Sequence, residues 1–389
     1  MKVLITGGTG TISSGLVKES VNRGYETYAI TRGTNNKRNI LGANYLHADI
    51  WDTENVSSVL GNLKFDVVVE CLAYGVEQLK ISLNNFSKRC SQYVFISTAG
   101  IYNRLGENRI KESDPKEFID WSYTRNKIEC EKYLVSFSDR TGLKYTIVRP
   151  TVTYGDYRIP FPIATRTPGW TFFDRMKSGQ IMLASDNVKF SIIHIDDFSN
   201  MVVSLFGNEK AMNEDFHIAS NDNDIYWDDV IRTAGEILNV EPKIVHVSPD
   251  VIKKVWPHIY DELAYNKNLS LVLDDSKIKR TSAHIQTIKL KEGLERTKNM
   301  MYTEYLSNDC MIDKKWNDFC NAVIFYSYKN HYLNEIETQM VKKYIDNYGS
   351  VDFEESIKRV MRSNKKEKLA IYVWGIKKHI KNILKDRDR

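Results

Sequence analysis

Short apolar runs alternate with amphipathic stretches through the first 150 residues. We predict strands where Val, Ile, Leu and Tyr cluster, at Lys2–Thr6, Glu26–Thr31, Tyr45–Ala48, Val67–Cys71, Tyr93–Ser97 and Tyr145–Arg149. Val67–Cys71 is apolar almost throughout, as expected of a strand that is covered on both faces. The stretch Thr11–Arg23 is predicted to be a helix that Gly24 ends. This alternation predicts an α/β fold built on a doubly wound parallel sheet.

The alternation stops near residue 156, and this change indicates how the chain is divided. Irregular chain is predicted around Pro160, Pro162, Pro168 and Gly169. A helix is predicted near Phe172–Ser178, and residues 300–348, rich in Tyr and Asn, are predicted to be helical. We therefore expect three parts: a first domain over 1–165 that the chain rejoins at about 190–220, a smaller lobe over 166–300, and a helical extension over 301–389.

The composition suits a soluble globular protein. Of the 389 residues, 42% are hydrophobic and 27% are charged, which excludes fibrous and mostly disordered proteins. Five cysteines stand apart in the chain and no His or Cys spacing predicts a metal site, so we expect a reducing compartment. The first apolar run is too short for a signal peptide, and no run reaches the roughly 18 apolar residues of a membrane span. We expect a cytoplasmic protein.

Positive charge is concentrated at the C-terminus. The chain carries a net charge of +5, and residues 356–389 hold twelve Lys or Arg against three Asp or Glu. The basic cluster Lys365–Lys368 precedes the apolar run Leu369–Ile376. Such a segment can make a weak contact with an anionic membrane surface. The run is not cleanly amphipathic, however, which favours a terminal helix docked on its own protein.

A glycine-rich turn joins the first predicted strand to the first predicted helix. It reads Thr6-Gly-Gly-Thr-Gly-Thr-Ile-Ser13. Glycines at Gly7 and Gly10 allow a tight turn and a close approach of the backbone to a pyrophosphate. The free N–H groups at the start of the helix, at Thr11 and Ile12, favour the same negative charge. The turn therefore predicts a dinucleotide site.

This turn resembles the T-G-G-T-G-x-x-G sequence of the extended short-chain dehydrogenase/reductases, the NAD-dependent epimerase/dehydratase family, with Ser13 in place of the third glycine. The resemblance implies a Rossmann-type domain, and we expect only slightly looser helix–strand packing at Ser13. It also implies further contacts to the cofactor, from Asp49 and Ile50 to the adenine, from Ala73 beside the nicotinamide ribose, and from the turn at Pro150 to the nicotinamide amide.

The end of the second strand usually selects the cofactor. An acidic residue at this point would bind the ribose 2′-hydroxyl of NAD, whereas this chain has Thr31-Arg32-Gly33. A guanidinium grips phosphate in a bidentate fork, so Arg32 could pair with the 2′-phosphate of NADP. We therefore expect NADP or NAD, with NADP slightly favoured.

A Tyr and a Lys four residues apart provide the candidate chemistry. Tyr123 and Lys127 fall in the predicted helix Ser122–Val135 and share one face of it. Twenty-five residues before Tyr123, Thr98 ends a predicted strand, and the surrounding segment resembles the F-I-S-S-A-x-V-Y stretch of the family. The resemblance implies a catalytic triad in which Tyr123 removes a proton from a sugar hydroxyl. Lys127, together with a positive nicotinamide ring, is expected to favour the Tyr123 phenolate.

Departures from the family narrow the expected reaction. Sugar-nucleotide dehydratases carry Asp-Glu after the catalytic Thr, whereas Ala99-Gly100 follows Thr98 here. A nucleotide-sugar epimerase is therefore expected first, and an NADPH-dependent ketoreductase second. Phe190 stands where many epimerases place a phosphate-binding Arg. The candidate phosphate partners are therefore Lys189, Arg158, Arg166 and Arg175, although for each of them we favour an ordinary surface charge. For Trp170, His194 and Asp196 we favour structural roles.

Two other expectations come from the resemblance. A homodimer, formed through a bundle that contains the Tyr123 helix, is expected by analogy. The H-I-D-D-F stretch and the Gly169-Trp170 segment resemble a branch that includes chloroplast stem-loop RNA-binding proteins. Those proteins have lost much of the catalytic set that this chain keeps, and the body of the chain is slightly acidic. We therefore expect an enzyme and no nucleic-acid partner.

Overall fold

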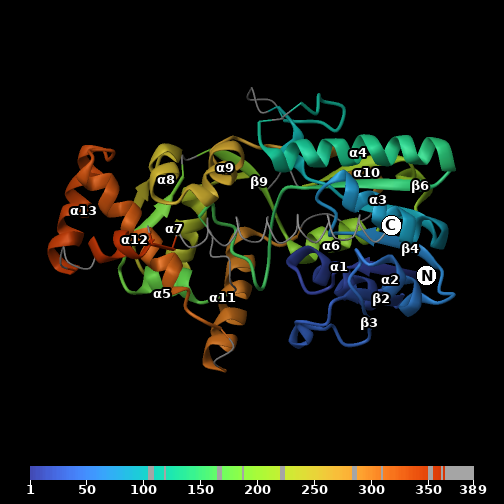
Figure 1. The fold of residues 1–389 in the computed structure, drawn as a ribbon. Helices are drawn as coiled ribbons and strands as arrows, with labels where there is room; N and C mark the ends of the chain where they lie inside the picture. The colour runs from blue at the N-terminus through green and yellow to red at the C-terminus, as the bar shows by residue number, and fades with distance from the viewer. Residues whose placement is uncertain are drawn as a thin grey trace, which may run out of the picture.

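A computed structural model of the chain describes residues 1–103, 109–117, 120–163, 169–185, 188–219, 224–282, 287–307, 310–348, 354–360 and 362–363. Figure 1 shows two lobes side by side, the first in blue to cyan and the second mainly in green to red. The first lobe holds a seven-stranded parallel sheet in the order β10-β6-β5-β4-β1-β2-β3. The predicted Rossmann-type sheet is therefore confirmed.

The strands of this sheet agree closely with the predicted ones. They are β1 (Lys2–Thr6), β2 (Glu26–Thr31), β3 (Asn44–His47), β4 (Phe65–Glu70), β5 (Cys90–Ile96), β6 (Lys144–Pro150) and β10 (Glu214–Ile218). The last of these pairs in parallel with β6, so the chain returns to the first lobe after it has left it. No strand was predicted at β10, because it has only five residues and the first two are acidic.

Helices cover both faces of the sheet. The helices are α1 (Thr11–Asn22) and α6 (Ile195–Val203) on one face, and α2 (Thr53–Leu60), α3 (Val76–Phe86) and α4 (Ser122–Thr141) on the other. Alternation along β1 shows the division, since Val3 and Ile5 join the core under α1 whereas Leu4 joins the core under α3. Gly15 makes the α1–α6 packing possible, because a Cβ there would lie 2.5 Å from Ile195.

The second lobe consists of two small sheets under helices. Its strands are β7 (Val152–Tyr154), β9 (Lys189–His194) and β11 (Asp224–Tyr226) in one sheet, and β8 (Met182–Ala184) and β12 (Ile244–His246) in the other. Its helices are α5 (Thr171–Lys177), α7 (Trp227–Leu238), α8 (Pro249–Val255), α9 (Tyr260–Glu262) and α11 (Leu290–Leu306). The chain returns once more to the first lobe at α10 (Ser276–Thr281), which packs on β10. The predicted helix near Phe172–Ser178 is α5. These short strands were not predicted, since three residues carry too little periodicity to recognise.

The C-terminal extension is helical where it is described. Its helices α12 (Lys314–Lys329) and α13 (Glu335–Tyr348) appear in orange and red beside α8 in Figure 1. Phe319 and Val323 of α12 are buried in the same core as the second lobe, and the Trp316 indole donates a hydrogen bond to the Ile163 carbonyl at 2.6 Å. The basic cluster and the apolar run that follows it lie outside the described residues. Within the described part, no helix is long and apolar enough to cross a membrane.

Candidate active site

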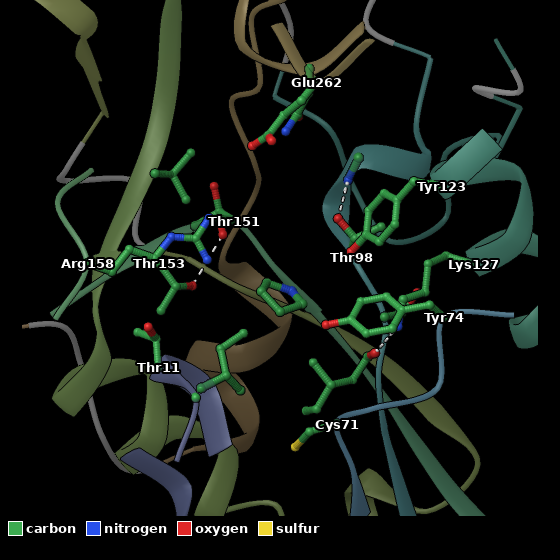
Figure 2. A pocket seen from close by; sticks show the side chains of 18 of the residues that line it. Thr11, Cys71, Tyr74, Thr98, Tyr123, Lys127, Thr151, Thr153, Arg158 and Glu262 are labelled. Atoms are coloured by element: carbon green, nitrogen blue, oxygen red, sulfur yellow. Dashed lines mark hydrogen bonds between the residues drawn. The ribbon is translucent and has the colours of Figure 1, made fainter. Parts of the chain in front are cut away.

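A cavity of about 530 Å³ opens where the two lobes meet, at the carboxyl ends of β1, β4, β5 and β6. The first lobe contributes the start of α1 and three of the predicted catalytic side chains, Thr98, Tyr123 and Lys127. Figure 2 shows these three side chains on one wall and Glu262 and Arg158 on the others. The topology explains the convergence, because parallel strands end at the same edge of a sheet and ligands bind in the crevice there.

The glycine-rich turn forms the floor of the cavity. Gly7 and Gly8 have positive φ values of 94° and 116°, which strain any residue other than glycine. A Cβ on Gly8 would also lie 2.9 Å from the Cβ of Ala29 on the neighbouring strand. The turn brings Gly10, Thr11 and the other first residues of α1 to the cavity surface, where backbone N–H groups can bind an anion.

Ser13 has a role that the sequence did not predict. Its hydroxyl accepts hydrogen bonds from the N–H groups of Gly8 (2.9 Å) and Gly10 (3.3 Å). It can also donate to the Gly10 carbonyl at 3.3 Å. We expected the serine only to loosen the packing of α1 slightly, whereas it links the start of the helix to the turn. The turn is therefore held by a side chain as well as by its backbone conformation.

Lys127 is fixed beneath the cavity by two backbone carbonyls. Its ammonium donates to the Ile96 carbonyl at 2.8 Å and to the Ala73 carbonyl at 2.9 Å. It also lies 4.9 Å from the centre of the Tyr74 ring and 4.7 Å from that of Phe95. Only 2% of the residue is exposed, and this burial lowers its pKa to about 8. With this pKa the ammonium is still mostly protonated at pH 7, and its third N–H can donate to a ligand in the cavity.

A buried carboxylate supports the turn that receives Lys127. Glu70, at the end of β4, is fully buried, and its Oε1 accepts hydrogen bonds from the backbone N–H groups of Leu72 (2.6 Å) and Ala73 (2.9 Å). The hydroxyls of Thr6 and Ser82 also donate to it. Burial raises the pKa of Glu70 and these hydrogen bonds lower it. Sequence reasoning missed this residue, although a lone acid in an apolar strand was a usable signal.

Thr98 and Tyr123 stand together on the same wall as Lys127. Thr98 ends the loop after β5, where its Oγ1 accepts a hydrogen bond from the Gly100 N–H at 3.1 Å. Tyr123 lies in the first turn of α4, as predicted, between the rings of Trp121 (4.7 Å between centroids) and Tyr74 (6.1 Å). The Thr98 side chain lies close enough to the Tyr123 phenol to lower its pKa. The geometry can therefore position one substrate oxygen between them.

The Tyr123 phenol is less acidic here than expected from its lysine neighbour. Burial, followed by Tyr74, raises its pKa to about 12, and Glu262 adds to this rise. The neighbouring Thr98 side chain and the positive charge of Arg158 lower this pKa and so oppose the rise. Arg158, rather than Lys127, is thus the cation with the larger effect on the phenol. The lowering predicted from the sequence also needs the positive charge of a nicotinamide ring beside Tyr123.

The second lobe supplies the opposite side of the cavity. Its contribution consists of Arg158, Glu262, Asn266, Lys267 and Leu271. Arg158 was a predicted phosphate partner, whereas the sequence did not single out Glu262 or Lys267. These two residues lie in a short helical segment that carries no motif, so only the fold brings them to the cavity. Lys267 is buried, and its ammonium lies 5.7 Å from the centre of the Trp227 ring.

An adjoining cavity of about 400 Å³ extends from the same turn. It shares Gly10, Thr11, Arg158, Glu262 and Lys267 with the first cavity and is otherwise lined largely by the apolar loop 159–163. Arg38 and Tyr157 also line it, and the Arg38 guanidinium stacks on the Tyr157 ring at 3.8 Å from its centre. Three cations therefore border this space, and two of them, Arg38 and Lys267, were not predicted.

Three of the predicted cofactor residues lie away from these two cavities. Arg32 is exposed just after β2, and the lining of neither cavity includes Arg32, Asp49 or Ile50. Asp49 is exposed and its carboxylate accepts a hydrogen bond from the Trp51 N–H at 3.1 Å. Ile50 is buried in the core beneath β2 and β4. By contrast, Ile12 and Pro150 line the main cavity, and the carbonyl of Ala73 is the one that binds Lys127.

The prediction that Arg175 could bind phosphate is wrong. Arg175 is 1% exposed, and its guanidinium donates to the Ile181 carbonyl and to the side-chain oxygens of Asn317 and Asn321 on α12. It therefore ties the extension to the second lobe. Lys189 is exposed on β9 outside both cavities, and Arg166 lies outside the described residues.

The favoured structural roles of Trp170 and His194 agree with their places in the structure. Trp170 is 7% exposed and packs among Phe173, Tyr302 and Tyr305. His194 is buried at the start of α6, where its Nδ1 accepts a hydrogen bond from the Asp196 N–H at 3.2 Å.

Curated relatives are similar to the chain over different lengths. The chloroplast stem-loop binding protein of 41 kDa b from Arabidopsis thaliana is 28% identical over 279 residues, which cover 66% of this chain and 69% of that protein. The UDP-glucose 4-epimerase of Lactobacillus helveticus is 30% identical over 168 residues, 38% of this chain and 51% of that protein.

Solved structures show the same fold at low identity. One is a UDP-glucose 4-epimerase from Thermotoga maritima in complex with UDP-glucose, with a TM-score of 0.65 at 21% identity. The match covers 79% of this chain and the whole of that one. Another is a UDP-glucuronic acid 4-epimerase from Bacillus cereus in complex with UDP-glucuronic acid and NAD, with a TM-score of 0.62 at 16% identity. This match covers 78% of this chain and the whole of that one.

The sequence model of the NAD dependent epimerase/dehydratase family matches residues 3–219. This match spans the glycine-rich turn, the Thr98 segment, and the pair formed by Tyr123 and Lys127. It therefore includes the whole of the first-lobe wall of the cavity and more than half of the chain. The chain belongs to the NAD dependent epimerase/dehydratase family.

Proposed function

We propose that the protein is an NAD(P)-dependent epimerase of a nucleoside diphosphate sugar, with Tyr123 as its acid and base. One observation carries the proposal: Thr98, Tyr123 and Lys127 stand on one wall of a cavity whose floor is the glycine-rich turn. A dinucleotide bound along that floor would run from the start of α1 toward the Tyr123 wall. The remaining space, between this wall and the second lobe, suits a sugar.

Each first-lobe side chain has a defined task in this mechanism. A bound nicotinamide would supply the chemistry of taking and returning a hydride. The Tyr123 oxygen takes the proton from the sugar hydroxyl as it becomes a ketone, and returns that proton when the hydroxyl is restored. Thr98 holds the same sugar oxygen by a hydrogen bond. Lys127, held by two carbonyls and with a pKa of about 8, has a third N–H that can donate to the cofactor ribose.

Nucleotide sugars are the proposed substrates for two reasons. The structural relatives named above bind UDP-glucose and UDP-glucuronic acid. In this chain the adjoining cavity is bordered by Arg38, Arg158 and Lys267, and guanidinium and ammonium groups bind phosphate oxygens well. We therefore propose that the diphosphate lies in this second cavity while the sugar lies against Tyr123. Ala99-Gly100, in place of an acidic pair after Thr98, argues against dehydration.

The resident dinucleotide is proposed to be NAD or NADP. A similar solved structure holds NAD, whereas the preference for NADP rests on Arg32, an exposed guanidinium just after β2. The test is to denature the purified protein and identify the nicotinamide cofactor that it releases. An epimerase regenerates its cofactor in each turnover and gains by retaining it, so we expect a near-stoichiometric amount. A protein that is isolated empty and binds NADPH reversibly would support the ketoreductase instead.

A second candidate function is RNA binding, which the relative from Arabidopsis thaliana supports. That protein is named for stem-loop binding, and its similarity covers 66% of this chain. A binder on the same fold would not need the Tyr123 hydroxyl, so Tyr123→Phe distinguishes the two functions. Loss of sugar turnover in this variant would support the enzyme. Tight, salt-dependent binding of a stem-loop RNA, unchanged by Tyr123→Phe and without any sugar turnover, would support the binder.

A homodimer through α4 stays a prediction. The exposed positions on the outer side of α4 are mainly polar or charged, namely Arg125, Asn126, Glu129, Lys132 and Ser136. A bundle formed there would depend on polar contacts and would weaken with salt. Light scattering on the protein as it elutes from a sizing column, at low and at high salt, tests the dimer and its salt dependence. A monomer under both conditions would contradict the dimer.

A further inference from the structure

We propose that Glu262 is a specificity-determining residue that accepts hydrogen bonds from the hydroxyls of a neutral hexose and disfavours sugars that carry a carboxylate. This inference rests on the proposed function, because it concerns the substrate of the same cavity. Glu262 comes from the second lobe and lines the same cavity as Thr98 and Tyr123 (Figure 2). No motif in the sequence marked it.

The backbone that carries Glu262 is well anchored. Glu262 ends α9 and is followed by a π-helical turn, Leu263–Lys267. Leu263 is 1% exposed, and the indole of Trp227 donates a hydrogen bond to the Lys267 carbonyl at 2.8 Å. Both ends of the turn are thus fixed in the second lobe. Glu262 is therefore presented to the cavity from a rigid element, which favours a precise contact with a ligand.

The Glu262 carboxylate is not engaged by the protein. Within the described residues it makes no hydrogen bond or ion pair. Other acids near the lobe boundary do have partners, since Asp224 pairs with Arg109 and Asp215 pairs with Arg149. Glu262 lines both the main cavity and the adjoining one. Glu262 therefore lies between the proposed positions of the sugar and the diphosphate, and both of its carboxylate oxygens can accept hydrogen bonds from a ligand.

The electrostatic contacts of Glu262 place it close to the reacting group. Its negative charge raises the pKa of the Tyr123 phenol, and the positive charge of Arg158 lowers it. The other groups that face this phenol are Tyr74, Thr98 and the buried Lys127 beneath it. A sugar whose hydroxyl reaches Tyr123 is thus within the range of the Glu262 charge. That charge is screened less here than at an open surface, because the cavity is walled by protein.

Carboxylate chemistry then decides which sugars fit. An ionised carboxylate accepts hydrogen bonds only, and it can receive two neighbouring sugar hydroxyls on its two oxygens. Such charge-assisted hydrogen bonds are about twice as strong as neutral ones. A uronic acid would bring a second carboxylate toward Glu262, and two like charges that are partly removed from water repel each other. Glu262 therefore favours neutral hexoses over hexuronates.

The experiment compares UDP-glucose with UDP-glucuronic acid as substrates of the full-length protein. The variants are Glu262→Gln, which removes the charge but keeps the size, and Asp261→Asn as the matched control. Asp261 is the preceding residue, exposed on the same short helix and absent from the lining of both cavities. We measure kcat and KM for each sugar, and the pH dependence of kcat.

We expect the wild-type protein to prefer UDP-glucose and Glu262→Gln to lose that preference. The variant should lower kcat/KM for UDP-glucose about tenfold, the effect of replacing a charge-assisted hydrogen bond by a neutral one. It should raise kcat/KM for UDP-glucuronic acid. It should also shift the alkaline side of the kcat profile to lower pH, because a negative charge near Tyr123 has gone. Asp261→Asn should change none of these quantities.

Three results would overturn the inference. The first is an unchanged ratio of the two sugars in Glu262→Gln, with the wild type active. The second is a wild-type preference for UDP-glucuronic acid. The third is that neither sugar binds or turns over, in which case the proposed function fails as well. In the first two cases the wild type is active, and loss of that activity in Tyr123→Phe would show that the epimerase proposal holds although the inference about Glu262 fails.

Discussion

The two lobes contribute to the cavity in different ways. From the first lobe come groups that the protein itself has already bound: Lys127 on two carbonyls, Ser13 on the turn, and Glu70 beneath it. From the second lobe come Glu262 and Arg158, which are exposed to the cavity. Groups held in this way suit a fixed chemical step, because they need no rearrangement during reaction. Charges that face open space suit recognition of a variable substrate.

Two buried arginines show how differently the lobes are stabilised. Arg149 in β6 is fully buried and pairs with Glu131 at 2.8 Å and with Asp215 at 2.5 Å. Arg175 in α5 is equally buried, but it donates to amide and carbonyl oxygens. The first lobe thus closes its sheet edge with a charge cluster. The second lobe attaches its helical extension with neutral acceptors, which are less costly to leave unpaired.

The largest effect is expected from removal of the Tyr123 hydroxyl. Tyr123→Phe should lower kcat by a factor of about 10² to 10⁴, the usual contribution of a general acid and base. Steady-state turnover of UDP-glucose, with thermal unfolding to check the fold, measures it. Tyr133→Phe on the same helix is the control, because Tyr133 does not line the cavity. Equal activity in the two variants would show that the first-lobe wall is not catalytic.

Replacing Arg149 should lower the free energy of unfolding more than replacing Arg175. Arg149→Met would leave Glu131 and Asp215 without their guanidinium, and breaking a buried pair in this way costs about 3–5 kcal/mol. Burial alone would raise the pKa of Asp215, but the positive charges of Arg149 and Lys116 lower it to about 2. Urea unfolding of the variant at neutral pH measures the loss. A change below about 1 kcal/mol would mean that the charge cluster does not stabilise the sheet edge.

A smaller loss is expected from Arg175. Arg175→Met would unpair neutral oxygens on α12 and at the end of α5, with an expected cost of about 1–3 kcal/mol. The effect should be confined to the second lobe, since Asn317 and Asn321 belong to the extension. Hydrogen exchange can localise it, with faster exchange expected in α12 and unchanged exchange in β1 to β6. Equally faster hydrogen exchange in both lobes would show that Arg175 does not stabilise the second lobe separately from the first.

Ser13→Ala should have a modest effect on both stability and cofactor retention. The variant removes the hydroxyl that accepts from Gly8 and Gly10, and net hydrogen bonds of this kind contribute about 0.5–1.5 kcal/mol each. We expect a lower melting temperature and faster release of the nicotinamide cofactor on dilution. Ser14→Ala, one residue along the same helix, is the control. Identical cofactor release in the two variants would assign Ser13 a packing role only.

The smallest effect is a pH dependence of the second lobe. His246 lies 2.9 Å from Asp228 and 3.4 Å from Glu337 of α13. The hydrogen bond to Glu337 is the main cause that raises its pKa to about 9, against an ordinary value near 6.5. A raised folded-state pKa means that this stabilisation is complete below about 6.5 and is lost as the pH rises through about 9. It should be at most about 1 kcal/mol, because the side chain is more than a third exposed.

Melting temperatures between pH 6 and 10 test the His246 prediction. The wild-type protein should lose stability across this range more than His246→Gln does, because the variant has no proton to release. Parallel curves for the two proteins would show that the histidine does not hold α13 to the lobe.

Most of the first lobe was predictable because local patterns suffice for it. Strands buried on both faces are continuous apolar runs, and the turn before α1 needs glycine for steric reasons. Glu70 and the strand β10 escaped prediction for the opposite reason. Glu70 is a single acid within an apolar run, and β10 is a short strand whose paired positions in β6 lie 68 residues earlier in the chain. The second lobe has short strands, and apart from Arg158 the residues that it contributes to the cavity could not be predicted.

The sequence by itself determined the family, the doubly wound sheet, and the positions of Thr98, Tyr123 and Lys127. These features depend on spacing within one helix, one strand or one turn, and local chemistry fixes them. Only the tertiary structure decided that Arg175 is buried, that Arg38 and Lys267 border a common cavity, and that Glu262 faces Tyr123. These residues are far apart in the chain, and packing of one lobe against the other determines which of them meet.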